Sequence, residues 1–164
     1  MSDDLHIRAR RTVELFTGAR LTLATAESCT GGLVGGALTA VPGSSAVLER
    51  GFITYSNAAK AEILDVPKEV LNAHGAVSEA VARAMAEGAL AHSRADVAVA
   101  ITGIAGPGGG SAEKPVGLVH FACARRDRPT RHVERRFGDI GRDAVRDASV
   151  LQALDLADEV ARQA

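Results

Sequence analysis

Short apolar runs alternate with helical patterns along this chain, and that alternation limits the folds open to it. Residues 21–26, 95–101 and 115–124 are rich in Ala, Val, Leu and Ile, as is typical of strands buried on both faces. Segments with helical spacing, such as residues 3–18 and 142–162, lie around them. We therefore expect an α/β protein, a three-layer α/β/α sandwich with a mostly parallel sheet. A short polar turn joins the last two strands, so part of the sheet is expected to be antiparallel.

Composition argues for a globular protein and against a nucleic-acid partner. The chain has 164 residues with no linker, repeat or low-complexity segment, so we expect one domain over residues 1–164. Aromatic residues make up 3% and Trp is absent, which argues against a surface on which nucleic-acid bases stack. The 19 basic and 20 acidic residues nearly cancel, so no overall field attracts a polyanion. We expect no nucleic-acid partner.

The sequence also carries no signal for export or membrane insertion. Residues 1–11 are charged and lack an apolar stretch, so no signal peptide is expected. No window approaches the run of about 18 apolar residues that a membrane span needs. Two isolated cysteines, Cys29 and Cys123, do not make a disulfide framework. We expect a cytoplasmic protein with no membrane partner.

The segment 27–32 joins an expected strand to an expected helix and contains the first candidate site. In an open α/β sheet, ligands bind at the carboxyl ends of strands, where a helix start offers unpaired N–H groups. Ser28 suits either of two roles there, a helix cap or a nucleophile beside an oxyanion site. Cys29 is a rival nucleophile, because a thiol at a helix start can have a lowered pKa. Gly31 and Gly32 would let a ligand approach the backbone closely.

Tyr55 and Lys60 form a second candidate pair, at the end of a β-rich stretch and in the short helix expected after it. Lysine is scarce in this chain, with three residues against 16 arginines. A desolvated Lys can act as a base, whereas Arg stays charged. The sequence leaves open whether Lys60 is such a base or an ordinary surface lysine.

A glycine-rich loop at residues 102–111 follows another apolar strand and is the third candidate. It fits neither the Walker A pattern nor the dinucleotide fingerprint, because Lys114-Pro115 leads into a strand and not into a helix. The loop is either a wide turn or a backbone nest for an anion such as a phosphate. The sequence does not decide between these two interpretations.

Metal chemistry has no clear basis in the sequence. The five histidines are scattered, with no ligand spacing on one element, and no acidic cluster suggests a magnesium site. We therefore expect no metal. A Ser-His-Asp triad assembled in space stays open, although no nucleophile-elbow pattern is present.

Taken together, several of these segments resemble the CinA C-terminal-domain family. The match covers nearly the whole chain, in order and at family-like spacing, and several motifs together make it specific. Many relatives carry an extra N-terminal domain, and this chain resembles the stand-alone form. The motifs are Ala26-Glu27-Ser28-Cys29-Thr30-Gly31-Gly32, Gly51-Phe52-Ile53-Thr54-Tyr55-Ser56-Asn57, Lys60, Gly75-Ala76-Val77-Ser78-Glu79, Thr102-Gly103-Ile104-Ala105-Gly106-Pro107-Gly108-Gly109 and Lys114-Pro115-Val116-Gly117.

This resemblance implies an activity and assigns roles to residues. Family members include nicotinamide-mononucleotide deamidases, which convert the carboxamide to a carboxylate with a serine–lysine pair and release ammonia. Carried over by motif, Ser28 falls on the nucleophile, Lys60 on the base and Tyr55 on a supporting residue. Ser45 falls on a second family serine. Arg142 falls on a basic site residue, although the turn before it is longer than the Gly-Asp-Arg turn of close relatives.

A mechanism follows from these roles. Lys60 must be neutral to take the Ser28 proton, and backbone N–H groups near Thr30 and Gly31 would stabilise the oxyanion. The glycine-rich loop with a basic side chain would hold a 5′-phosphate. No cofactor is implied. The expected substrate-binding residues are Thr30, Gly31, Gly32, Thr102, Gly103, Gly106 and Arg142.

Two other functions stay open at this point. In the first, the chain is an amidase for another small nucleotide. In the second, it is a non-catalytic nucleotide-binding or protein-interaction module, which the family's link to competence and DNA damage suggests. The expected partner is a small-molecule nucleotide. We also expect a homo-oligomer, on the family resemblance and the Ala-rich composition.

Overall fold

A single five-stranded sheet organises the computed structural model, which describes residues 1–164. No helix in it combines the length and the apolar character needed to cross a membrane. The strands are β1 (Leu23–Glu27), β2 (Leu48–Ile53), β3 (Val97–Gly103), β4 (Leu118–Arg125) and β5 (Arg131–Arg136).

Strand order in the sheet is β2-β1-β3-β4-β5. Strand β1 lies between β2 and β3 and runs parallel to both, with Glu27 opposite Ile53 of β2 and Ile101 of β3. The last two strands form a hairpin, and β4 is antiparallel to β3 and to β5. The α/β fold with a partly antiparallel sheet, as expected from the sequence, is therefore confirmed. Its parallel part brings the carboxyl ends of β1, β2 and β3 to one edge.

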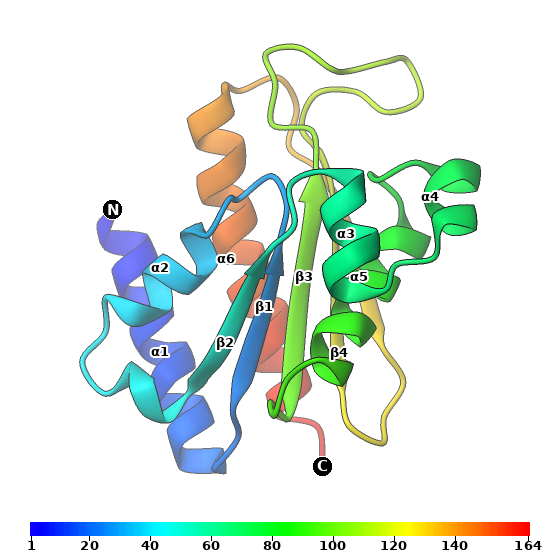
Figure 1. Cartoon of the computed structure of the whole chain (residues 1–164). Coiled ribbons are helices and arrows are strands. Elements are labelled where there is room, and N and C mark those ends of the chain that lie inside the picture. Colours follow the sequence, from blue (N-terminus) through cyan, green and yellow to red (C-terminus); the bar gives the residue numbers. More distant parts are fainter.

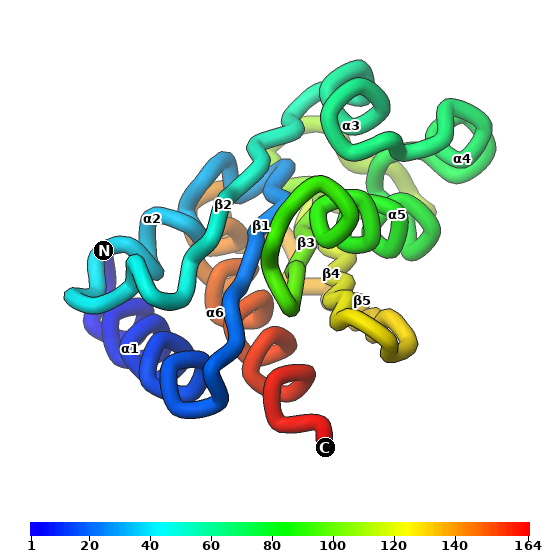
Figure 2. Tube along the Cα trace, turned by 60° about the horizontal axis from the view of Figure 1, so that its bottom comes forward, coloured from blue at the N-terminus to red at the C-terminus, as the bar shows by residue number.

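Helices cover both faces of the sheet and complete the three layers (Figure 1). Figure 2 shows the sheet from another direction, with helices on either side of it. A short 3₁₀ turn, Ser44–Ala46, precedes β2. The helices of one face are α1 (Asp3–Ala19), α2 (Leu33–Thr39) and α6 (Arg142–Ala161), and those of the other face are α3 (Asn57–Leu64), α4 (Lys68–His74) and α5 (Glu79–Ala91).

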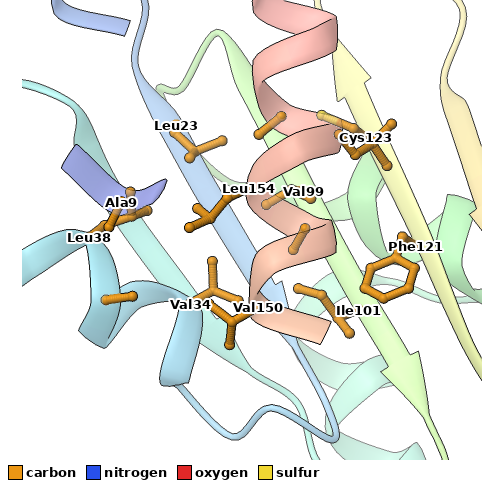
Figure 3. Packing of buried hydrophobic residues seen from close by; sticks show 14 of the residues in the cluster. Ala9, Leu23, Val34, Leu38, Val99, Ile101, Phe121, Cys123, Val150 and Leu154 are labelled. Atoms are coloured by element: carbon orange, nitrogen blue, oxygen red, sulfur yellow. The ribbon is translucent and has the colours of Figure 1, made fainter. Parts of the chain in front are cut away.

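Alternation along the strands builds two different cores. In β3, Val97, Val99 and Ile101 point into the core under α1, α2 and α6, where large aliphatic side chains interlock (Figure 3). The intervening Ala98 and Ala100 face α5. These small side chains let α5 pack close to the sheet.

Most element boundaries expected from the sequence lie within a few residues of those observed, and the helix caps show why some differ. Ser78 caps α5 as its position suggests, because its Oγ accepts the N–H of Val81 at 3.2 Å. Asn57 could also cap a helix by its residue type, but it is the first residue of α3. The cap is Ser56, whose Oγ accepts the N–H of Ala59 at 3.0 Å.

Candidate active site

Ser28 and Lys60 meet at the carboxyl edge of the sheet. Ser28 directly follows β1, and Lys60 lies one turn into α3, which follows β2 and packs against α5. The Lys60 Nζ is 3.0 Å from the Ser28 Oγ, and it also donates to the carbonyls of Thr54 at 2.8 Å and Tyr55 at 3.1 Å. Lys60 is only 1% exposed. All its polar contacts are neutral groups of the chain, so no carboxylate balances its charge.

Burial therefore lowers the pKa of Lys60 from 10.5 to about 8. At that value a substantial fraction of the amine is neutral near physiological pH and can accept a proton. Burial has the opposite effect on Cys29, raising the pKa of its thiol to about 11. Cys29 therefore stays a thiol, which disqualifies it as the rival nucleophile because the thiolate is the reactive form.

Glu27 takes the capping role that Ser28 could have had. Helix α2 begins at Leu33, and its first residues are anchored by the buried Glu27 carboxylate. The hydroxyl of Thr30 donates to the Glu27 Oε1 at 2.6 Å. Sequence reasoning missed this role, although an acid ending an apolar strand before two glycines was a signal. The remaining donors to the carboxylate are the N–H groups of Gly32 at 3.2 Å, Val34 at 2.9 Å and Gly35 at 3.0 Å.

The turn after Ser28 keeps two N–H groups free. Gly31, at φ +58, donates its N–H to the Ser28 carbonyl at 3.0 Å and closes the turn. The sequence led us to expect Gly31 and Gly32 to bind the ligand. Their amides both donate within the chain, however, so these N–H groups are not available to a ligand. The N–H groups of Cys29 and Thr30 donate to no group of the chain. Such orphan donors cost about 1–3 kcal/mol when buried, and a ligand oxygen would satisfy them.

The glycine-rich loop forms the opposite wall of a cleft of about 270 Å³. Thr102 lines the cleft and uses its hydroxyl internally, donating to the Ala76 carbonyl at 3.0 Å. Gly103 also lines it and packs against Val119 too closely for any side chain. Past β3, five N–H groups of the loop have no acceptor in the chain, so they are available to solvent or to an anion. They belong to Ala105, Gly106, Gly108, Gly109 and Gly110.

Arg142 and Tyr55 span the mouth of this cleft. Arg142 is the first residue of α6, whose start lies at the same edge as the glycine-rich loop (Figure 1). Its Nη1 donates to the Gly106 carbonyl at 2.8 Å, and its Nη2 donates to the Tyr55 hydroxyl at 3.1 Å. The lengthened turn before Arg142 thus still brings the guanidinium to the site. Tyr55 is 62% exposed.

Ser45 is not brought to the cleft. It lies in the 3₁₀ turn before β2, and β2 runs parallel to β1 with Leu48 beside Leu23. Ser45 is therefore at the amino edge of the sheet, whereas Ser28 is at the carboxyl edge. Within this chain, the second serine implied by the resemblance cannot act on a substrate bound at Ser28.

Comparison with known proteins decides the family. The sequence model of the protein family described as the CinA C-terminal domain matches residues 6–161 of this chain. This chain belongs to the CinA C-terminal domain family. A CinA-like protein of Parasynechococcus marenigrum is 58% identical over 135 residues, which make up 82% of this chain and 32% of the relative. The chain spans about a third of the length of the curated relatives it matches.

Solved structures of CinA proteins share the fold over nearly their full length. The competence/damage inducible protein CihA from Agrobacterium tumefaciens is 54% identical, with a TM-score of 0.96 and coverage of 99% of this chain and 98% of that one. A CinA superfamily protein from Escherichia coli is 33% identical, with a TM-score of 0.89 and coverage of 99% and 94%. Fold and family are therefore established, whereas these names state no substrate.

Proposed function

We propose that this CinA-family protein hydrolyses the carboxamide of nicotinamide mononucleotide, giving nicotinate mononucleotide and ammonia. The observation that carries the proposal is the 3.0 Å contact between the Ser28 Oγ and the Nζ of a buried lysine without a counter-charge. A neutral amine beside a hydroxyl can activate it as a nucleophile. Amide hydrolysis by this route uses groups of the chain and a water molecule.

The reaction passes through an acyl-enzyme. Neutral Lys60 accepts the hydroxyl proton as the Ser28 Oγ attacks the carboxamide carbon. The resulting oxyanion accepts hydrogen bonds from the free N–H groups of Cys29 and Thr30. The Lys60 ammonium then gives its proton to the leaving nitrogen, the C–N bond breaks and ammonia departs. Water then attacks the ester with Lys60 again as the base. This step releases nicotinate mononucleotide and restores the Ser28 hydroxyl.

Charge arrangement in the cleft favours a substrate with a phosphate. The N-terminal amides of α2 are already occupied by the Glu27 carboxylate, so that helix start has little left to attract an anion. The free N–H groups of the glycine-rich loop and the guanidinium of Arg142 are the remaining anion-binding groups. A mononucleotide whose phosphate binds there can extend its carboxamide toward Ser28.

The substrate assignment is tested with the unmodified chain and three amides: nicotinamide mononucleotide, nicotinamide riboside and free nicotinamide. We expect ammonia and nicotinate mononucleotide from the first. The riboside should have a kcat/KM lower by at least about 10-fold, because it lacks the charge-assisted phosphate contacts. Turnover is measured by ammonia release and mass spectrometry.

Each other outcome points to a different function. Equal turnover of the riboside would contradict a phosphate site in the cleft. Turnover of a different amide-bearing nucleotide alone would keep the amidase and change its substrate. Saturable nucleotide binding without any ammonia release would favour the non-catalytic module.

A further inference from the structure

The turn that holds Ser28 is clamped by a side chain from a distant part of the chain. Arg146 lies in α6, one helical turn after Arg142. Its Nε donates to the Cys29 carbonyl at 3.1 Å, and its Nη2 donates to the Thr30 carbonyl at 3.3 Å. A Cβ atom at Gly31 would lie 3.3 Å from the same Nη2, so the guanidinium rests directly against the turn. Two consecutive carbonyls are thus held by one planar group.

Fixing these carbonyls also fixes the N–H groups of the same peptides. The bond between Cys29 and Thr30 is trans, so its C=O and N–H point in opposite directions. Because Arg146 holds the Cys29 carbonyl, the Thr30 N–H is directed away from the guanidinium. Thr30 is fully buried and this N–H has no acceptor in the chain. The clamp therefore keeps an orphan donor in place at the turn that carries the nucleophile.

We propose that Arg146 is a positioning residue for the reaction, acting through the Cys29–Thr30 peptide to hold the oxyanion-binding N–H in the orientation that the transition state needs. This inference rests on the proposed function, because it requires Ser28 to form a tetrahedral intermediate. Arg146 itself contacts only backbone carbonyls of the turn.

Glu27 holds the other side of the same segment. Its carboxylate binds the Thr30 hydroxyl and the amides that begin α2. With the carbonyls held by Arg146 and the later amides held by Glu27, the Cys29 and Thr30 N–H groups are the donors left without a partner. An oxyanion site that is preorganised in this way costs no reorganisation during the reaction.

The test compares Arg146→Gln and Arg146→Lys with a matched arginine elsewhere. Arg125 is also half-buried and donates to backbone carbonyls, those of Val160, Ala161 and Gln163 at the end of α6, but it lies at the opposite edge of the sheet. We expect Arg146→Gln to lower kcat about 10²-fold with KM little changed, the loss typical of one oxyanion donor. Arg146→Lys should recover part of that loss by holding one carbonyl. Arg125→Gln should keep the wild-type kcat.

A second readout does not depend on the substrate. A fluorophosphonate reagent reacts with an activated serine: the Oγ–P bond forms, the P–F bond breaks, fluoride leaves and Lys60 takes the hydroxyl proton. The rate of Ser28 labelling is followed by mass spectrometry in each variant, and thermal unfolding shows that each is folded. We expect slower labelling in Arg146→Gln, with the pH midpoint of labelling unchanged because Lys60 is intact.

These outcomes separate the two proposals. If the wild type labels at Ser28 but does not hydrolyse nicotinamide mononucleotide, the substrate assignment fails and the labelling rates still decide the role of Arg146. Wild-type kcat in Arg146→Gln, a raised KM at unchanged kcat, or an equal loss in Arg125→Gln would each overturn the positioning role. So would a wild type that neither labels nor turns over.

Discussion

Replacing Ser28 with alanine should abolish hydrolysis of nicotinamide mononucleotide, lowering kcat by at least about 10⁴-fold. The substitution removes the only hydroxyl within hydrogen-bond distance of the Lys60 Nζ, and without it no acyl-enzyme can form. The fold should be unaffected, because the Ser28 side chain caps no helix and Glu27 anchors the start of α2 instead. Substrate should still bind, since the loop amides and Arg142 remain.

Two further serines make this experiment specific. Ser93 lies at the opposite edge of the sheet, where its Oγ donates to the Leu90 carbonyl, and Ser93→Ala should retain full activity. Ser45→Ala addresses the second serine implied by the resemblance. Loss of activity in Ser45→Ala together with activity in Ser28→Ala would show that the nucleophile has been assigned to the wrong residue. Ammonia release and thermal unfolding are measured for all three variants.

Replacing Lys60 with methionine should lower kcat/KM by about 10²–10⁴-fold, the usual contribution of a general base. Methionine fills the same buried volume but cannot accept a proton. In the wild type, kcat/KM should rise with pH and level off above about pH 8, because burial lowers the pKa of Lys60 to about 8 and only its neutral form is a base. The residual activity of Lys60→Met should lack that rise.

A surface lysine provides the control for this substitution. Lys68 is exposed at the start of α4, and Lys68→Met should leave both kcat/KM and its pH dependence unchanged. If Lys60→Met retained the wild-type rise with pH, a different group would be the base. If it retained full activity at every pH, Lys60 would have no part in the mechanism.

The fold could be predicted from the sequence because it depends on local signals, whereas Ser28 and Lys60 were paired only through the family resemblance. Buried strands reveal themselves by apolar runs, and helix starts by residues such as Ser78. Ser28 and Lys60 stood in segments of the family pattern. Their contact, however, joins residues 32 positions apart and follows from the way the fold brings α3 to the carboxyl end of β1.

The residues that support the site could not be predicted from the sequence, because their contacts also join distant parts of the chain. Arg146 reaches the turn after Ser28 from more than 100 positions away, and one arginine among 16 carries no local mark of that contact. Glu27 ends an apolar strand shortly before two glycines, but only the folded structure reveals that its carboxylate binds the first amides of α2. Gly31 was expected beside the ligand, and only the hydrogen bonds reveal that its N–H is used within the chain.

The most direct test of the account is an NMR titration of the Lys60 amine in protein carrying ¹³C at the lysine Cε positions. The chain has three lysines, so spectra of Lys68→Arg and Lys114→Arg assign the Lys60 signal by elimination. We expect a midpoint near pH 8 for Lys60. A midpoint at the ordinary lysine value of 10.5 would leave the amine charged at neutral pH and would contradict its role as the base that activates Ser28.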